Sequence, residues 1–251
     1  MAILSRRWTT QIFTIAFGVC SIAWTTFSVT FYRTEEFLGD FSRRILSGEV
    51  YSEPQLILLK TRLDATPARR LRSVALNDVA VIRLLMTETE LAKNRQISTS
   101  DMAGLEAIVT DALNGSPTNS FMWLAKYWME QVRAGAGDGG FNFLRMSYLF
   151  GPNEAWIGIK RNSVALNSFA SLPDDLAEQV LAEFPRLVDS GLRREAANIL
   201  AGPGWPLHEK LLGRLAKTDE ANRRALAKAL ESKDIDGNIV PGLGQRPARP
   251  F

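Results

Sequence analysis

Residues 8–32, "WTTQIFTIAFGVCSIAWTTFSVTFY", form a run without any charged residue. A helix of about 20 apolar residues crosses the hydrocarbon core of a bilayer, so this run is long enough to span one. Serine and threonine interrupt it, but in a helix their hydroxyl groups bond to the chain's own carbonyl groups, which lowers their cost in lipid. Trp8 and Tyr32 place aromatic rings at its two ends, which suits the headgroup zone. We therefore predict a cytoplasmic N-terminus over residues 1–8 and a transmembrane anchor over residues 9–32.

The alternative interpretation of this run is a cleaved signal peptide. Such a peptide has an apolar region of about 7–15 residues followed by a cleavage site of small residues. The run over residues 8–32 is longer, and no such site follows it. Length therefore favours an uncleaved anchor, and the lack of a polar face argues against a helix that lies on a soluble protein.

The orientation of the anchor depends on the basic residues that flank it. Arg6 and Arg7 precede it closely, whereas Arg33, Arg43 and Arg44 follow it. The counts are nearly balanced, but a basic pair on the short side is typical of an N-terminus in the cytoplasm. If the cell is a Gram-negative bacterium, this orientation places the rest of the chain in the periplasm.

Composition excludes several classes of function. Hydrophobic residues make up 46% of the chain, which is enough for a folded core. The net charge of +3 comes from arginines near the two ends, so the body lacks the basic face of a nucleic-acid-binding domain. With one cysteine, Cys20, and one histidine, His208, the chain has too few ligands for a Cys/His zinc site and cannot form an internal disulfide.

Successive helices with short breaks are predicted over residues 52–232. Capping signals recur, such as Ser52 with Gln55, Ser98 with Asp101, and Thr66 before Pro67. A linker is predicted over 33–51 and a disordered tail rich in proline, glycine and arginine over 233–251. The predicted helices span 54–64, 67–93, 100–113, 118–133, 140–150, 153–170, 173–189, 192–200, 206–216 and 219–232, and Pro185 is expected to kink or split the helix that contains it.

The stretch 132–143, "VRAGAGDGGFNF", contains Gly135, Gly137 and Gly140 in the spacing of a dinucleotide-binding loop. That loop requires a strand before its first glycine. Apolar residues upstream instead recur every three or four positions, which indicates a helix. The glycines are therefore interpreted as a turn between two helices, and no cofactor is predicted.

Residues 121–152 resemble a tetratricopeptide repeat. Large Phe121 and Trp128 alternate with small Ala125 in the first half, and small Ser147 and a closing Pro152 mark the second. Small residues let paired helices approach, and bulky ones fill the groove beside them. The resemblance implies an all-α fold in which the transmembrane helix precedes a stack of antiparallel helix pairs, a degenerate tetratricopeptide-like solenoid over residues 52–232.

The segment "PTNSFMWLAKYW…FNFLRMSYLFGPNEAWIGIKR", behind a membrane anchor, is similar to single-pass tetratricopeptide-like proteins encoded with bacterial surface-polysaccharide machinery. The resemblance implies a non-catalytic scaffold in the bacterial inner membrane that binds proteins of a membrane-associated complex outside the cytoplasm, in surface-polysaccharide assembly or export. No catalytic motif matches, so no catalytic, cofactor-binding or metal-binding residue is predicted.

Two candidate contact sites remain. Trp123 and Tyr127 share a helix face and are candidates for a partner groove, with core packing as the alternative. Arg43 and Arg44 are candidates for contact with lipid headgroups. Asp174 and Asp175 are interpreted as acids that favour a helix start, and His208 as a surface or partly buried residue.

Three functions stay open at this point. A scaffold predicts exposed apolar or aromatic residues along a concave face. A glycan- or cell-wall-acting enzyme with unrecognised carboxylates predicts a deep pocket in which acids face one another. A regulator that acts through the anchor itself predicts that an unrelated span cannot replace residues 8–32.

Overall fold

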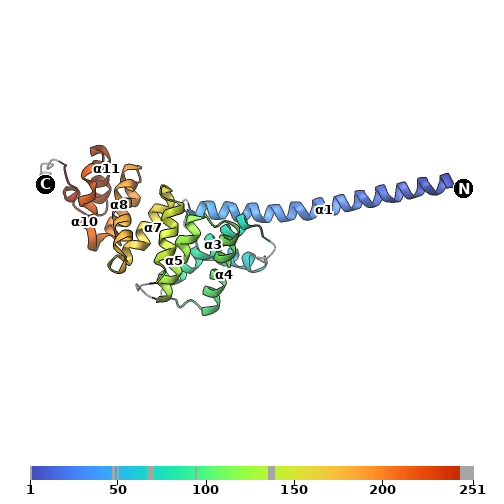
Figure 1. Cartoon of the computed structure of the whole chain (residues 1–251), viewed down its shortest axis with the longest axis horizontal. Helices are drawn as coiled ribbons and strands as arrows, with labels where there is room; N and C mark the ends of the chain where they lie inside the picture. Colours follow the sequence, from blue (N-terminus) through green and yellow to red (C-terminus); the bar gives the residue numbers. More distant parts are fainter. Residues whose placement is uncertain are drawn as a thin grey trace. The chain divides into compact units, whose positions relative to one another are not determined.

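The computed structural model describes residues 2–46, 49, 51–66, 71–93, 95–134 and 139–243. Within these ranges all regular secondary structure is helical, which confirms the all-α prediction (Figure 1). The chain divides into two compact units, Met1–Ile97 and Ser98–Phe251, so the helices predicted as one domain over 52–232 belong to two.

The helices occur in the predicted order, and most of their bounds lie close to the predicted ones. Unit 1 contains α1 (Ala2–Leu46), α2 (Glu53–Asp64) and α3 (Ser73–Ala92). Unit 2 contains α4 (Thr99–Gly115), α5 (Ser120–Ala134), α6 (Phe141–Phe150), α7 (Ala155–Asn167), α8 (Asp174–Asp189), α9 (Arg193–Ala201), α10 (His208–Gly213) and α11 (Glu220–Glu231), with short 3₁₀ turns at Phe169–Ser171, Trp205–Leu207, Arg214–Lys217 and Gly237–Ile239.

Helix α1 is long and apolar enough to cross a membrane, judged by length and composition, over Gln11–Leu46. Large apolar side chains in its first half are exposed, for example Phe13 at 76% and Trp24 at 73%. Two of the predicted hydroxyl bonds are present: Thr25 Oγ1 donates to the carbonyl of Ser21 at 2.8 Å, and Thr26 Oγ1 donates to the carbonyl of Ile22 at 2.9 Å. At these two positions the hydroxyl group is satisfied within the helix, which lowers its cost in lipid.

The predicted linker over residues 33–51 is largely helical instead. Helix α1 continues without a break to Leu46, and Glu35, Leu38, Gly39 and Ser42 are buried. Positions i, i+3, i+4 and i+7 lie on one face of a helix, and here that face packs against α3. The uncharged run predicted as the anchor and the first helix of the folded unit are thus one continuous helix.

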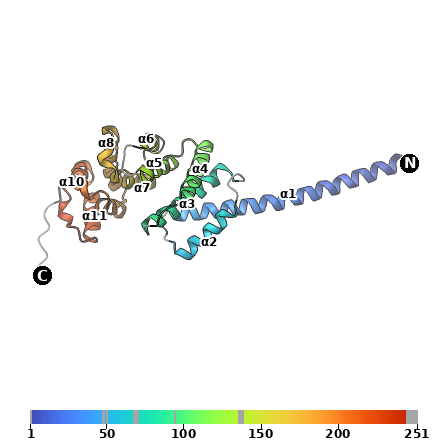
Figure 2. The same cartoon turned by 90° about the horizontal axis from the view of Figure 1, so that it is seen from below.

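The three helices of unit 1 have a fixed sense relative to each other (Figure 2). Arg72, which precedes α3, contacts Glu35, and Asp78 contacts Ser42 further along both helices, so α3 runs parallel to α1. Helix α2 runs the opposite way, because Glu53 at its start pairs with Lys93 just after the end of α3. Asp64 at the end of α2 pairs with Arg83 in the middle of α3, which agrees with this sense.

Helices α5 and α6 form an antiparallel hairpin. Its turn contains the glycine motif; Gly135 and Gly137 lie outside the described residues, but Gly140 adopts a left-handed φ of +83° as the N-cap of α6. A Cβ atom at Gly140 would lie 3.0 Å from Cβ of Glu130 near the end of α5. No strand precedes this turn in the described part of the chain, so the interpretation of Gly140 as part of a turn between helices is confirmed.

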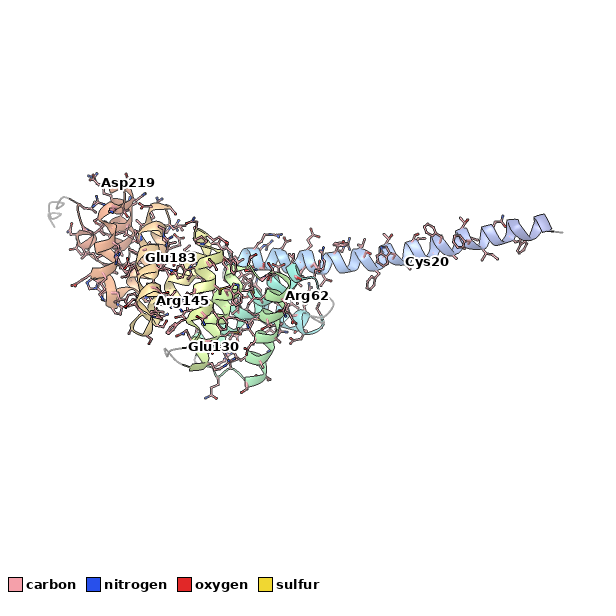
Figure 3. All side chains as sticks on the ribbon, in the orientation of Figure 1. Cys20, Arg62, Glu130, Arg145, Glu183 and Asp219 are labelled. Atoms are coloured by element: carbon pink, nitrogen blue, oxygen red, sulfur yellow. The ribbon has the colours of Figure 1, made fainter. Side chains whose placement is uncertain are left out.

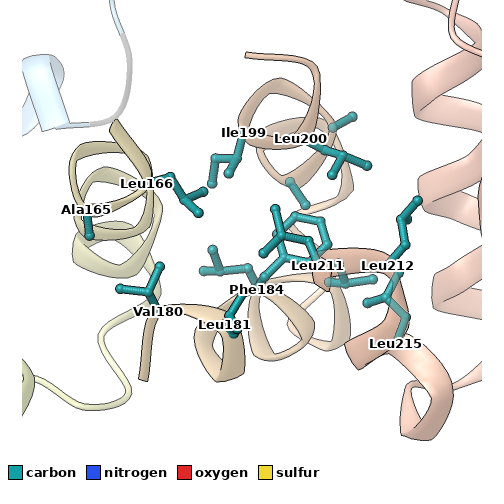
Figure 4. Close-up of a cluster of buried hydrophobic side chains, with 14 of the residues drawn as sticks. Ala165, Leu166, Val180, Leu181, Phe184, Ile199, Leu200, Leu211, Leu212 and Leu215 are labelled. Carbon is teal, nitrogen blue, oxygen red and sulfur yellow. The ribbon is translucent and has the colours of Figure 1, made fainter. Parts of the chain in front are cut away.

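The core of unit 2 joins its helices from α5 to α11. Phe184 on α8 is fully buried among leucines from α7, α9 and α10, including Leu166, Leu200 and Leu211 (Figure 4). Buried Leu226 and Leu230 of α11 belong to the same cluster. This continuous apolar core explains why the chain folds without a disulfide.

Several local predictions need correction. Pro185 does not split its helix, because α8 runs from Asp174 to Asp189 as one element. The start predicted at Thr66 lies beside residues outside the described ranges, and the described part of α3 begins at Ser73. The predicted disordered tail is partly ordered: Ile235 and Ile239 pack on the core, and Val240 is buried. Residues 244–251 of that tail lie outside the described residues.

Candidate functional site

A pocket of about 320 Å³ lies in unit 2, where the start of α7 meets the end of α8. The two helices are antiparallel, since Gly158 approaches Leu187, whereas Asn162, one turn later on α7, donates to the carbonyl of Val180 at 2.8 Å. The pocket is lined by Pro152, Asn153, Glu154, Ala155, Gly158, Glu183, Arg186, Leu187, Asp189 and Ser190. Gly158 is placed where a Cβ atom would meet Oε1 of Glu183 at 3.1 Å, so only glycine fits there without displacing that carboxylate.

Glu183, which is labelled in Figure 3, lines this pocket and forms a buried ion pair with Arg161. The guanidinium of Arg161 is fully buried and donates to Oε1 of Glu183 from Nη2 at 2.6 Å and from Nε at 3.0 Å. Its other donors bond to the backbone carbonyl groups of Ser147 and Gly151 and to the Ser147 hydroxyl. Every nitrogen of the guanidinium is therefore bonded, which is what a buried arginine requires.

Tyr148 completes the network around Glu183. Its hydroxyl donates to Oε2 of Glu183 at 2.9 Å, and Cζ of Arg161 lies 4.0 Å from the centre of its ring. Burial, followed by the negative charge of Glu183, raises the pKa of Tyr148 well above its ordinary value. The tyrosine therefore remains a neutral hydrogen-bond donor.

The other acids at the pocket also have partners. Oε1 of Glu154 lies 3.4 Å from the Ser120 hydroxyl. The Asp189 carboxylate accepts from the backbone N–H of Asp219 and from the side chains of Thr218 and Asn222, so it joins the end of α8 to the start of α11. These hydrogen bonds fix helix ends to one another, which gives both carboxylates a structural role.

The residues predicted for a partner groove separate in the structure. Tyr127 is fully buried, and its hydroxyl lies 2.6 Å from the Ser168 hydroxyl, so its ring does not line an open groove. Trp123 is half-buried; its indole N–H donates to the carbonyl of Pro117, and its ring stacks on Phe143 at 6.0 Å. Helix α5 contacts α4, α6 and α7, so its aromatic side chains do not form an exposed face.

Two exposed apolar residues of unit 2, Trp156 and Leu149, were not predicted from the sequence. Trp156, at the start of α7, packs on Phe121 at 5.2 Å and is 38% exposed. Leu149 on α6 is 67% exposed. A scaffold predicts exposed apolar side chains of this kind. The sequence alone could not distinguish these two residues from core residues.

The remaining candidate residues have simple structural roles. Arg43 pairs with Asp40 one turn earlier on α1, and both Arg43 and Arg44 are exposed. Asp175 forms a bidentate ion pair with Arg145, whose hydrogen bonds lower the pKa of that carboxyl. Nδ1 of His208 lies 2.8 Å from the carbonyl of Trp205, and the two rings stack at 4.7 Å.

No group of three or more His, Cys, Asp or Glu side chains within the described ranges could hold a metal ion. No protein-family model matches the chain, and no curated protein or solved structure is significantly similar to it.

Proposed function

We propose that this chain is a non-catalytic scaffold of the bacterial inner membrane, anchored by residues 9–32, that holds partner proteins outside the cytoplasm. The observation that carries the proposal is the exposed apolar half of α1. Phe13, Phe17 and Trp24 each expose more than two thirds of their surface, which water would penalise and a bilayer would cover. The helix then delivers a folded helical body to one side of the membrane.

The proposal extends to a tetratricopeptide-like stack in unit 2. The α5–α6 hairpin supports it, because Gly151 approaches Ser120 so closely that a Cβ atom would lie 2.3 Å from its hydroxyl. Small residues at such crossings are what the repeat uses to bring paired helices together. Helices α7 and α8 supply a second antiparallel pair.

Exposed side chains of unit 2 provide a surface for partners. Leu149 and the Phe121–Trp156 pair present apolar area that the unit itself does not cover. Aromatic and large aliphatic residues commonly anchor protein contacts. We extend the proposal to assembly or export of surface polysaccharides on the resemblance suggested by the sequence of residues 117–161 alone.

The test is site-specific crosslinking in native membranes. A photo-reactive amino acid at Leu149 is expected to give discrete adducts with membrane-complex proteins, while the same group at exposed Glu231 on α11 gives none or different ones. Absence of any adduct from Leu149, together with glycan or cell-wall polymer cleavage by the purified chain, would overturn the scaffold in favour of an enzyme.

A further inference from the structure

The pocket between α7 and α8 has walls of two kinds. Pro152, Ala155 and Leu187 contribute apolar surface, and charged or polar side chains line much of the rest. Its volume of about 320 Å³ lies at the lower end of the range for ligand pockets, which is roughly 300–1,000 Å³. The pocket therefore has room for one side chain or one small molecule.

Negative charge predominates among the residues that line this pocket. The carboxylates of Glu154, Glu183 and Asp189 lie there with a single guanidinium, that of Arg186. Arg161 balances Glu183 from behind, and Arg186 balances one of the other two acids. One negative charge remains, and a ligand that carries a single positive charge would neutralise it.

The two exposed acids, Glu154 and Asp189, have acceptor capacity to spare. Glu154 lies 3.4 Å from the Ser120 hydroxyl, and the three donors that Asp189 meets around the start of α11 lie at 3.4–3.5 Å. Strong hydrogen bonds are shorter, at about 2.7–3.2 Å, and all four of these donors are neutral. By contrast, Asp175 and Glu178 on α8 each accept from an arginine, at 2.8 Å and 2.7 Å.

Glu183 supplies a fixed charge to the pocket. It is only 3% exposed, and hydrogen bonds from Arg161 and Tyr148 hold its carboxylate. A Cβ atom at Gly158 would lie 3.1 Å from Oε1 of Glu183 and 3.2 Å from Cδ2 of Leu187, so glycine leaves the space beside this carboxylate open. Direct contacts with a ligand therefore belong to Glu154 and Asp189, and Glu183 acts through its charge.

The spacing of the acids selects the kind of cation. Within the described ranges these carboxylates do not converge closely enough to hold a metal ion. Acids set apart around a pocket suit a larger cation with several N–H donors, such as a guanidinium or an ammonium group. The apolar walls suit the aliphatic stem that carries such a group in arginine and lysine.

We propose that this pocket receives an arginine or lysine side chain of a partner protein. The inference rests on the proposed scaffold function and specifies the chemistry that its partner presents. A protein suits the site better than a free solute, because the exposed Trp156 directly follows Ala155 and packs on Phe121. This aromatic pair adjoins the pocket and offers a second anchor to a chain whose basic side chain fills it.

Binding of a capped amino acid to the full chain in detergent tests the charge preference. The probe is N-acetyl-arginine methylamide, and its citrulline counterpart keeps the shape but lacks the charge. In a Cys20→Ser background, a fluorine label is attached at Asn153→Cys, at the pocket, or at Lys228→Cys, exposed on α11, and is followed by NMR. The arginine probe is expected to shift the label at Asn153 saturably, to bind at least about tenfold more tightly than citrulline, and to leave the label at Lys228 unchanged.

Charge variants test which acids make the site. Glu154→Gln with Asp189→Asn keeps the size of both side chains and is expected to weaken binding of the arginine probe at least about tenfold. Asp174→Asn removes an exposed acid at the opposite end of α8 and is expected to leave the affinity unchanged. Equal shifts by the arginine and citrulline probes, no shift by either, or an unchanged affinity of the double variant would overturn the inference.

Crosslinking in native membranes separates this inference from the scaffold on which it rests. A photo-reactive amino acid at Asn153 is expected to give a protein adduct that Glu154→Gln with Asp189→Asn removes. Adducts from Leu149 without a selective arginine site would overturn the pocket inference alone and leave the scaffold. Selective binding of the arginine probe with no protein adduct from Asn153 or Leu149 would overturn the protein partner and assign the pocket to a free cationic solute.

Discussion

Arg161 on α7 and Glu183 on α8 form an ion pair inside unit 2, where the two side chains expose 0% and 3% of their surface. Nη2 of the arginine lies 2.6 Å from Oε1 of the glutamate. Through Ser147, Tyr148 and Gly151 the pair also bonds to α6 and its C-cap. It therefore links three helices at the wall of the pocket between α7 and α8.

Replacing Glu183 with glutamine is expected to destabilise unit 2 by about 3–5 kcal/mol, because a buried guanidinium would lose its counter-charge. Replacing both residues, as Arg161→Met with Glu183→Leu, is expected to cost much less than the sum of the two single changes. Hydrogen exchange in peptides of α7 and α8, on the full chain in detergent, measures the free energy of opening. Equal stability of Glu183→Gln and the native chain would show that the pair is not shielded from water.

Sequence reasoning could not find this pair. Arg161 sits in "IKRNSVALN", beside Lys160 and among polar residues, and reads as part of a solvated helix face. Its burial results from the antiparallel contact of α7 with α8, which brings together residues 22 positions apart. Such pairing depends on tertiary packing, whereas capping and periodicity report only local structure.

Helix boundaries, in contrast, depend on local structure, and the capping residues predicted them well. The Ser98 hydroxyl accepts from the N–H of Asp101 at 3.0 Å, and α4 begins at Thr99, one residue from the predicted start. Helix α8 begins at Asp174 behind Pro173, also within one residue. These boundaries are set by groups within one turn of each other, so the sequence contains the information that decides them.

Two wrong predictions have one cause: the sequence does not show which neighbouring helix covers an apolar helix face. The segment after the anchor was predicted as a linker, although Phe37, Leu38, Phe41 and Ile45 already follow helical spacing. Tyr127 was a groove candidate, although α5 is covered on three sides. In both cases the apolar pattern indicated a helix, and only the tertiary structure shows which neighbours bury it.

Gly151 is expected to tolerate no side chain. A Cβ atom there would lie 2.3 Å from Oγ and 2.6 Å from Cβ of Ser120, which is buried. Gly151→Ala is expected to destabilise the α5–α6 hairpin by about 1–3 kcal/mol, since the helices must move apart.

The matched control for Gly151 is Gly104→Ala in the interior of α4. Nothing lies within 4 Å of a Cβ atom at that glycine, so alanine is expected to stabilise the helix by up to about 1 kcal/mol. Thermal unfolding followed by circular dichroism compares the two variants. A similar small effect of both would contradict the close approach at Gly151.

Asp78 is expected to make the stability of unit 1 depend on pH. Burial raises the pKa of this carboxyl above its ordinary 3.8, and Glu35 adds to that, while the Ser42 hydroxyl and Arg43 act in the opposite direction. The folded state therefore holds the proton more tightly than the unfolded state, so stability falls as pH rises from 3.8 through the raised value.

Asp78→Asn removes that loss and can still accept the hydrogen bond from Ser42. We expect the variant to equal or exceed the native chain in stability at pH 7 and to match it below pH 3.8. Hydrogen exchange in α3 peptides, corrected for the intrinsic effect of pH, measures this difference. A variant that is less stable at pH 7 would mean that the charged form of Asp78 is favoured by the fold.

The central claim is that the membrane span and the first helix of unit 1 are one uninterrupted rod. It is tested most directly by the distance between spin labels at Ile22→Cys and Asp40→Cys, in a Cys20→Ser background, with the full chain in lipid nanodiscs. Both positions are exposed, and 18 residues separate them by five whole turns, so the labels share one face of the helix. The account predicts one narrow distance distribution centred at about 27 Å. A broad distribution, or a clearly different distance, would show a hinge after Tyr32 and contradict the account.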